Sequence, residues 1–407
     1  MKILHTADWH LGKKLDHYAR LPEQHEVLDE ICAIADAQAV DVVVVAGDLF
    51  DTFNPSIEAA ELLYRTLHRL SNGGKRPVIA IAGNHDSPER IQMPDALARI
   101  CGIIFIGFPK QIITPLKTEG FEITKSDAGF IEIKLVNSPV PLRIIHTPYA
   151  NEVRLKTYLG AEDKEANLRD TLASHWQDLA SQYLDDKGFN LLISHLYFMK
   201  KGGEPEEEPE GEHSILHVGG AQAIFSENIP AGVHYVALGH LHRYQTVDKK
   251  PCPIVYSSSP LAYSFAEANQ VKNVVILHTA AGVLEKYEAI PLQKGRKLLQ
   301  ATFNDTDKAV EWLAAIQNAL VQLTIEADTY LDATVKKRLY EAHDGLINII
   351  PQLKNSKSQA EEAVQIDLQK NVTDLFIDYF NYKKGQSPST EIMEMLKEIM
   401  ADNQETE

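Results

Sequence analysis

The 407-residue sequence is short of cysteine, of long apolar runs and of positive charge. Its three cysteines, Cys32, Cys101 and Cys252, are odd in number and widely spaced, which excludes a disulfide scaffold and a CxxC-type metal site. Apolar runs such as residues 42–46 are far shorter than the roughly 20 residues that a membrane helix needs. With no secretory signal visible, these absences predict a cytoplasmic protein with no membrane contact.

The charge balance is acidic, with 40 Lys and Arg against 57 Asp and Glu, a formal net charge of −17. A chain of this charge does not hold nucleic acid through a broad basic surface of its own. The hydrophobic fraction of 44% is sufficient for a real core, and the length predicts two or three domains.

Residues 1–292 alternate short apolar runs with helix-like stretches. The run at 42–46 does not alternate with polar residues, which is typical of a strand buried on both faces. Apolar residues recur at helical spacing over 27–35 and 62–70. Further strands are predicted at 77–82, 143–146, 189–194, 234–238, 255–256 and 273–277, and a further helix at about 167–186. Strands alternating with helices predict an α/β domain whose sheets are covered by helices.

The rest of the chain divides into two smaller parts. Strands at 298–303, 319–327 and 346–353 with helices at 307–317 and 333–343 predict a small α+β domain. Residues beyond it are polar at first and then amphipathic, with apolar anchors such as Leu368, Leu375 and Phe376. We therefore predict three parts, over 1–292, 293–354 and 355–407. Within the first part, residues 204–212 contain six glutamates and no basic residue, which predicts a flexible surface loop.

Asp, Asn and His side chains follow five of the predicted strands at the point where each strand ends. They are Asp8, His10, Asp48, Asn84, His195, His240 and His242. Ligands of open α/β sheets gather at the carboxyl ends of the strands, so we expect these side chains to meet at one rim. Each short motif alone is common, and the ordered set of five is what carries the prediction.

These residue types indicate a metal centre. Imidazole and carboxylate ligands without thiolates suit Mn²⁺, Fe²⁺ or Zn²⁺. Asp8 and His10 are two residues apart, so in an extended segment both point the same way; His240 and His242 share this spacing. Asp48 is short and anionic and could bridge two ions. Seven ligands predict a two-metal site of the kind that catalyses phosphoester displacement.

His85 and Asp86 stand beside the ligand set. His85 is predicted to assist the leaving oxygen as a proton donor, and Asp86 to orient the His85 ring. His146 also ends an apolar run, and we interpret it as a packing residue. Arg154 with Lys156, and the pair at 200–201, are candidate phosphate contacts.

The ordered motifs resemble those of the calcineurin-like metallophosphoesterases, and more closely those of the SbcD family of nuclease subunits. The matching segments are 4–12, 46–51, 82–87, 237–243 and 258–265. The resemblance implies a four-layer α-β-β-α sandwich with a small capping domain. Two departures stand out: Ser258 replaces a glycine that is frequent in the family, and Asp51 replaces a histidine of archaeal and eukaryotic relatives.

The resemblance also implies roles for the ligand set. One ion, most simply Mn²⁺, would be held by Asp8, His10, Asp48 and His242, and a second by Asp48, Asn84, His195 and His240. His85 would assist cleavage. The implied activity is ATP-stimulated 3′→5′ double-strand exonuclease and single-strand endonuclease action in DNA recombination and repair. The implied partners are an SbcC-type ATPase, which the C-terminal part would contact, DNA ends, hairpins and single strands, and a second copy of the chain within a heterotetramer.

Two other functions stay open on the sequence alone. A small-molecule metallophosphodiesterase would use the same ligands, but it would not require the extra domain and the amphipathic tail. A non-catalytic partner that tethers DNA ends would not require seven intact ligands.

Overall fold

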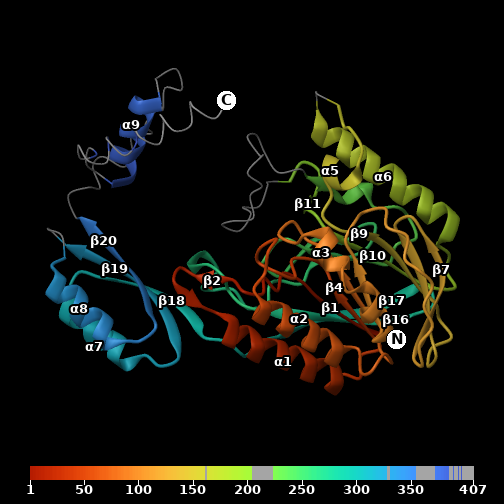
Figure 1. The fold of residues 1–407 in the computed structure, drawn as a ribbon, viewed down its shortest axis with the longest axis horizontal. Coiled ribbons are helices and arrows are strands. Elements are labelled where there is room, and N and C mark those ends of the chain that lie inside the picture. The colour runs from red at the N-terminus through yellow and green to blue at the C-terminus, as the bar shows by residue number, and fades with distance from the viewer. Residues whose placement is uncertain are drawn as a thin grey trace.

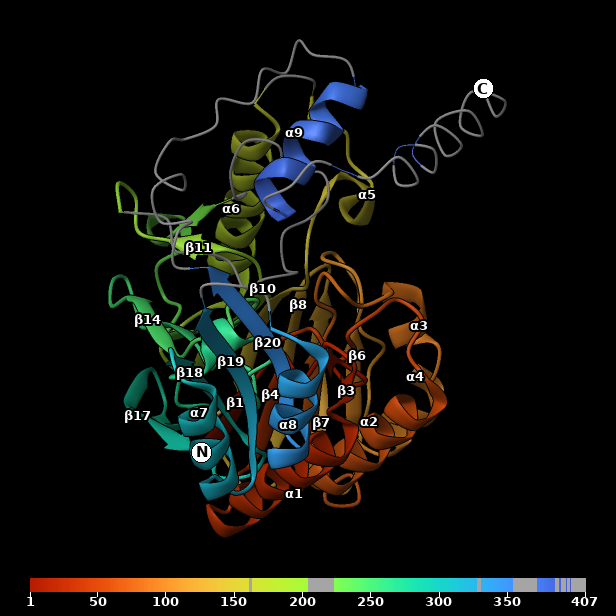
Figure 2. The same ribbon diagram turned by 90° about the vertical axis from the view of Figure 1, so that its left-hand side faces the viewer.

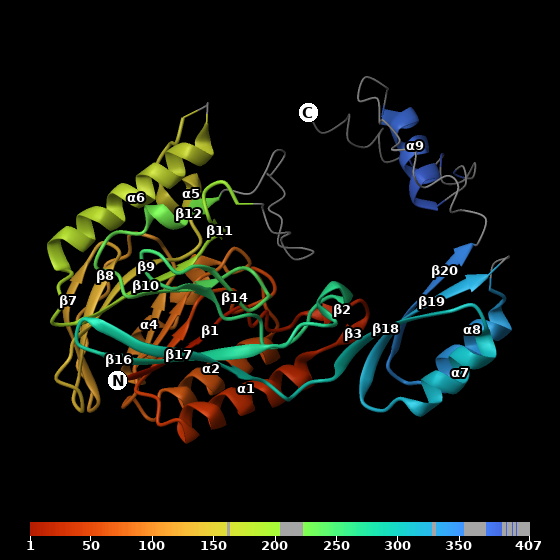
Figure 3. The ribbon, with the colours of Figure 1, turned by 180° about the vertical axis from the view of Figure 1, so that it is seen from behind.

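The computed structural model describes residues 1–160, 163–203, 223–327, 331–353 and 372–384, with the single residues Pro388, Met393 and Leu396. The large part of the molecule consists of two sheets that lie between helices (Figure 1). A smaller sheet with its own helices stands beside it, as the reverse view also shows (Figure 3). No helix of the described residues has the length and apolar character needed to cross a membrane.

The first large sheet has the strand order β17-β16-β1-β4-β5-β6. Its strands are β1 (Lys2–Thr6), β4 (Val42–Val45), β5 (Val78–Ile81), β6 (Ile103–Ile106), β16 (Asn273–Ala280) and β17 (Val283–Pro291). The first four of these pair in parallel, whereas β16 pairs antiparallel with β1 and with β17. The parallel strands are almost fully buried, which explains their unbroken apolar sequences.

The second large sheet has the order β14-β15-β13-β10-β9-β8-β7. Its strands are β7 (Phe121–Asp127), β8 (Phe130–Leu135), β9 (Leu142–Thr147), β10 (Phe189–His195), β13 (Tyr235–Gly239), β14 (Gln245–Asp248) and β15 (Ile254–Tyr256). Strand β10 pairs in parallel with β9 on one side and with β13 on the other. The carboxyl ends of β9, β10 and β13 therefore lie at one edge of the sheet.

Three apolar clusters separate four layers. One lies between the first sheet and the helices α1 (Leu21–Ala37) and α2 (Ile57–Leu70), and a second lies between the two sheets. The third packs α6 (Lys164–Tyr183) on the outer face of the second sheet. Short elements complete this part: β2 (Lys14–Leu15), β3 (Tyr18–Ala19), α3 (Pro88–Gln92), α4 (Asp95–Ile100), α5 (Glu152–Leu155), β11 (Phe198–Met199) and β12 (Ile224–Phe225). The four-layer sandwich is the predicted fold.

The small sheet has the order β18-β19-β20, and all its strands are parallel. Its elements are β18 (Lys297–Phe303), α7 (Thr306–Ala315), β19 (Ala319–Ala327), α8 (Ala333–Ala342) and β20 (Leu346–Leu353). Figure 2 shows α7 and α8 in front of this sheet. The other face contacts the large part through a cluster that joins Leu298, Leu320 and Ile347 to Leu15 and Phe265. The tail contributes α9 (Val372–Lys384).

The predicted strands at 319–327 and 346–353 have the boundaries that the structure shows, and the predicted helices are found within a few residues of their expected ends. Among the strands of the two large sheets, the sequence prediction missed β6, the β7–β8 hairpin, β14 and β17. The acidic segment 204–212, the polar segment after residue 353 and Leu368 lie outside the described residues.

Candidate metal centre

The predicted ligands come together between the carboxyl ends of strands from both large sheets. Asp8 and His10 follow β1, Asp48 follows β4, Asn84 follows β5, His195 ends β10, and His240 and His242 follow β13. Nearly all of these side chains are buried, and four of them are fully inaccessible: Asp8, His10, Asp48 and His195. Such burial of polar groups is costly unless they are bonded to each other or to a ligand.

The backbone around the ligands is unusual, and it corrects one expectation. Asp8, His10, Asp48 and His240 have φ values of 55°, 44°, 49° and 108°, so the ligand-bearing segments are not extended. The two-residue spacing works because left-handed residues turn the chain, and such conformations concentrate at functional sites. Gly83 is required for a steric reason, since a Cβ there would lie 2.0 Å from Asp48 Oδ1.

Asp48 lies in the middle of the cluster. Its Oδ2 atom is 3.5 Å from His10 Nε2 and 3.2 Å from His195 Nε2. Asn84 Oδ1 is 2.9 Å from His195 Nε2 and 3.2 Å from His240 Nδ1. The Asp48 carboxylate therefore has candidate ligands on two sides, which is the arrangement that a ligand shared by two ions requires.

Asp8 and His242 lie with His10 on the other side of the Asp48 carboxylate. The Nε2 atoms of His10 and His242 are 3.0 Å apart, so the two rings point at one place. The ligand atoms of Asp8, His10 and His242 lie within 4.8 Å of one another. Asp8 Oδ1 accepts a hydrogen bond from the backbone N–H of His240 at 2.8 Å, whereas the buried Oδ2 accepts none among the described residues.

In the metal-free cluster, the pKa values of Asp8 and His195 are shifted far from their usual values. Burial raises the pKa of Asp8 to about 7, although His195 and His242 oppose the shift. For His195, burial favours the neutral ring, but the carboxylates of Asp48 and Asp8 outweigh it and raise its pKa to about 9. A divalent cation relieves both conditions, because it pairs with the carboxylates and displaces the imidazole protons. The donor set and the Asp8 Oδ2 atom, which has no hydrogen-bond partner in the described part of the chain, thus fit divalent metal binding.

His85 lies at the edge of this cluster. Its backbone N–H donates to Asp48 Oδ1 at 3.0 Å, and its ring Nδ1 is 2.8 Å from the carbonyl oxygen of Asp51. A carbonyl can only accept, so Nδ1 carries a proton. The predicted role of Asp86 in orienting the His85 ring stays a prediction, and the structure shows another role for its carboxylate. The Asp86 carboxylate accepts hydrogen bonds from the backbone N–H groups of Leu49, Phe50 and Gly83, and so joins the two ligand loops.

A buried ion pair behind His242 was not predicted. Glu267 Oε1 is 3.4 Å from His242 Nδ1, and Glu267 Oε2 is 2.5 Å from Lys272 Nζ. Lys272 Nζ also donates to the carbonyl oxygen of His242 at 2.8 Å. Burial opposes ionisation of Glu267, but His242 and Lys272 hold its pKa well below the usual range. A carboxylate behind a ligating histidine fixes the orientation of the ring.

Three other residues are clarified by the structure. Arg154 is a wrong phosphate candidate, because its buried guanidinium donates to the carbonyl oxygens of Gly83 and Asp86. His146 is buried in β9, as a packing residue should be. Ser258 has a φ of 82°, which is the left-handed conformation that glycine prefers, and its hydroxyl accepts from the backbone N–H of Asn273 at 2.9 Å.

Comparison with known proteins places this site in context. A family model described as calcineurin-like phosphoesterase matches residues 1–244. The D subunit of the nuclease SbcCD from Bacillus subtilis (strain 168) is 34% identical over 100% of this chain and 99% of its own length. The protein of the same name from Rhodobacter capsulatus is 30% identical over 78% of this chain and 75% of its own. A solved structure from Thermus thermophilus aligns with 72% of this chain and 99% of its own, at 13% identity and a TM-score of 0.39.

Proposed function

The chain belongs to the calcineurin-like phosphoesterase family and, within it, to the SbcD nuclease subunits, and on that basis we propose that it hydrolyses phosphodiester bonds of DNA at a two-metal centre. The observation that carries the proposal is the position of Asp48, whose carboxylate lies between ring nitrogens of His10 and His195. The finer activities proposed are 3′→5′ exonuclease action on double strands and endonuclease action on single strands, in recombination and repair.

The ligands divide between two ions, for which we propose Mn²⁺. Asp8, His10, Asp48 and His242 would hold one, and Asp48, Asn84, His195 and His240 the other. When bound, the ions supply positive charge that stabilises the attacking and leaving oxygens of the displacement. The protein fixes the ligands in advance: the Asp86 carboxylate joins the loops that carry Asp48 and Asn84, and Glu267 orients His242.

His85 is proposed to serve the leaving oxygen. Because Nδ1 is held by the Asp51 carbonyl oxygen, the ring has one orientation relative to the ligand loops. The proton that reaches the leaving oxygen comes from the other ring nitrogen, Nε2, so the active form is the imidazolium. The Asp51 carboxylate accepts from Lys13 Nζ at 2.8 Å and is 3.7 Å from His10 Nδ1. One of its oxygens lies within 4.8 Å of a ring nitrogen of His85, so a negative charge is near the His85 ring.

The proposed partners are DNA and an SbcC-type ATPase. We propose that residues 1–292 form the nuclease domain, 293–354 a capping domain and 355–407 the region that contacts the ATPase. Within α9, Leu375 and Phe376 are two of the apolar anchors for a helix-in-groove contact.

We also propose a homodimer, because exposed apolar side chains concentrate around α2–α4. They are Phe53, Ile57, Met93, Leu97 and Ile100. The three free cysteines agree with a cytoplasmic location.

The test uses the full-length chain with Mn²⁺ and two substrates, a labelled DNA hairpin and a small phosphodiester. We expect the unaltered protein to cut the hairpin, and His85→Ala to lose at least about 100-fold in cleavage rate while it still binds Mn²⁺. Hydrolysis of the small phosphodiester alone would support a small-molecule phosphodiesterase instead. Hydrolysis of neither substrate, with or without the ATPase partner, would support a tethering protein.

A further inference from the structure

Two cavities flank the segment that carries Glu267 and Lys272. One has a volume of about 450 Å³ and is lined by Arg243, Tyr244, Ala266, Asn269, Gln270, Val271 and Asn273. The other, of about 520 Å³, lies between this segment and the small sheet. It is lined by Leu15, Asp16, Tyr263, Ser264, Phe265, Ala266, Gln300, Gln322 and Asn348. Ala266 lines both cavities, so the two lie on either side of this residue.

The lining of both cavities is rich in amide side chains. On the small sheet, Gln300 lies opposite Gln322, and Gln322 lies opposite Asn348, so three amides form a row across three neighbouring strands. Gln300 Nε2 donates to Gln322 Oε1 at 2.8 Å, whereas no hydrogen bond of the Asn348 side chain is found among the described residues. The row is on the face opposite to the helices α7 and α8, next to the contact with the large part.

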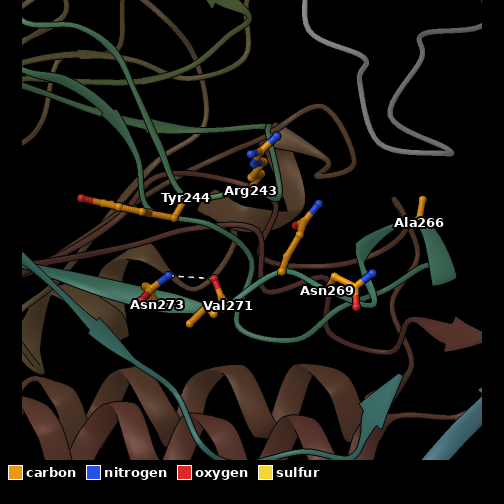
Figure 4. A pocket seen from close by; sticks show the side chains of 7 residues that line it. Arg243, Tyr244, Ala266, Asn269, Val271 and Asn273 are labelled. Carbon is orange, nitrogen blue, oxygen red and sulfur yellow. Dashed lines mark hydrogen bonds between the residues drawn. The ribbon is translucent and has the colours of Figure 1, made fainter. Parts of the chain in front are cut away.

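Further amides continue on the segment itself. Figure 4 shows Asn269 and Ala266 at one side of the first cavity and Arg243, Tyr244 and Asn273 at the other. The Asn269 side chain makes no hydrogen bond within the described part of the chain. The buried residues of the same segment, Glu267 and Lys272, face His242 instead. One segment therefore presents the exposed Asn269 amide outward and the ion pair inward to a metal ligand, while Gln270 Oε1 accepts from Lys272 Nζ at 3.1 Å.

Two charged residues line these cavities, Arg243 in the first and Asp16 in the second, and the other polar lining residues are uncharged. Arg243 follows the metal ligand His242 directly, is exposed and forms no ion pair among the described residues. Two cations beside the metal centre are already bound: Lys13 pairs with Asp51, and Lys272 pairs with Glu267. An amide offers both a donor and an acceptor, which matches the edge of an unpaired base, whereas a phosphate is matched best by a cation.

We propose that the amides of the two cavities form a track that holds one strand of the DNA substrate by its bases, with Arg243 binding a phosphate where the strand reaches the metal centre. The track consists of Asn269, Gln300, Gln322 and Asn348. This proposal rests on the proposed DNA nuclease function and names how that site holds its strand. It also explains how a chain with a net charge of −17 handles DNA: most of the contact is uncharged.

The test measures binding of two labelled single strands of equal length, one with bases and one abasic, over a series of salt concentrations. Proteins carry His85→Ala so that neither strand is cut. The track variant adds Asn269→Ala, Gln300→Ala, Gln322→Ala and Asn348→Ala. The matched control adds Gln177→Ala and Gln182→Ala, two exposed glutamines of α6 on the far layer. A third variant adds Arg243→Ala.

We expect the parent and the control to bind the strand with bases at least about tenfold more tightly than the abasic strand, because several amide hydrogen bonds contribute. In the track variant this preference should fall to about twofold or less. The slope of the logarithm of the binding constant against the logarithm of the salt concentration should stay unchanged. Arg243→Ala should keep the preference and reduce the slope by about 0.7, the value for one phosphate of a single strand.

An equal preference in the track variant and the parent, or no preference in the parent, would overturn the proposal. The proposal would also be overturned if the salt slope fell more in the track variant than in Arg243→Ala. Failure of the proposed function appears in a different measurement, because it is read from DNA cleavage by the protein that retains His85. Abasic strands therefore test the track whether or not the chain cuts DNA.

Discussion

His195 and His146 lie on neighbouring parallel strands of one sheet, and both rings are fully buried. Their pKa values are nevertheless shifted in opposite directions. The carboxylates of Asp48 and Asp8 outweigh burial and raise the pKa of His195 to about 9. Burial lowers the pKa of His146 to about 3, and neither of its ring nitrogens has a hydrogen-bond partner among the described residues. A buried histidine after an apolar run becomes a ligand candidate only where carboxylates from other strands reach it.

The same comparison extends to His242, whose ring is backed by Glu267. Glu267→Gln should leave His242, like His146, without a carboxylate partner. The neutral amide no longer offsets a positive charge on the His242 ring or on Lys272. We expect Mn²⁺ affinity to fall by about 10- to 100-fold, the usual effect of removing a carboxylate behind a ligating histidine. Titration calorimetry of the metal measures the effect directly.

A matched control separates orientation of the ligand from loss of a buried charge pair. Glu132 and Arg143 form an equally buried pair at 2.9 Å in the second sheet, and neither residue is among the candidate ligands. Glu132→Gln should destabilise the fold, since Arg143 loses one of its two carboxylate partners and keeps only Asp185, but Mn²⁺ affinity should stay as in the parent. Equal losses of affinity in both variants would show that Glu267 acts through general stability alone.

The second prediction concerns pH and metal removal. The pKa of His195 in the metal-free fold, about 9, is above the unfolded value of 6.5, so its contribution to stability is complete below pH 6.5 and is lost as the pH rises to 9. Asp8, raised to about 7, loses its contribution between about pH 4 and 7. We expect the melting temperature in EDTA to fall by several degrees from pH 6.5 to 9.

Mn²⁺ should reverse this trend, because bound cations favour ionised carboxylates and neutral imidazoles. The difference in melting temperature between Mn²⁺-loaded and EDTA-treated protein should therefore grow from pH 6.5 to 9. Calorimetric melts at constant ionic strength provide the measurement. A difference that shrinks over this range would contradict the assignment of His195 as a ligand with carboxylate partners.

Much of this arrangement could be predicted from sequence because each ligand directly follows an apolar run. A strand buried on both faces has an unmistakable pattern, as at 42–46, and its carboxyl end locates the ligand. What escaped prediction depends on contacts between distant segments. Glu267 and Lys272 meet His242 across the fold, and Arg154 is satisfied by backbone carbonyl oxygens, neither of which leaves a periodic pattern. The left-handed conformation of Asp8 was missed because Asp is enriched there only several-fold, so that a single Asp after a strand does not specify it.

The smallest expected effect returns to His146. Its two buried nitrogens lack partners among the described residues, so burying them costs free energy that an apolar side chain of similar volume avoids. We expect His146→Leu to raise the free energy of unfolding by about 1 kcal/mol, measured in urea at pH 7 with Mn²⁺ present.

His5 is the matched control, because it is equally buried but its nitrogens lie 3.2 Å from Tyr235 Oη and 3.0 Å from the Leu238 carbonyl oxygen. His5→Leu should destabilise by about 1–3 kcal/mol, since those partners lose their hydrogen bonds inside the fold. Destabilisation by both substitutions would mean that His146 is held by more than packing, and the contrast with the carboxylate-backed histidines would then need another cause.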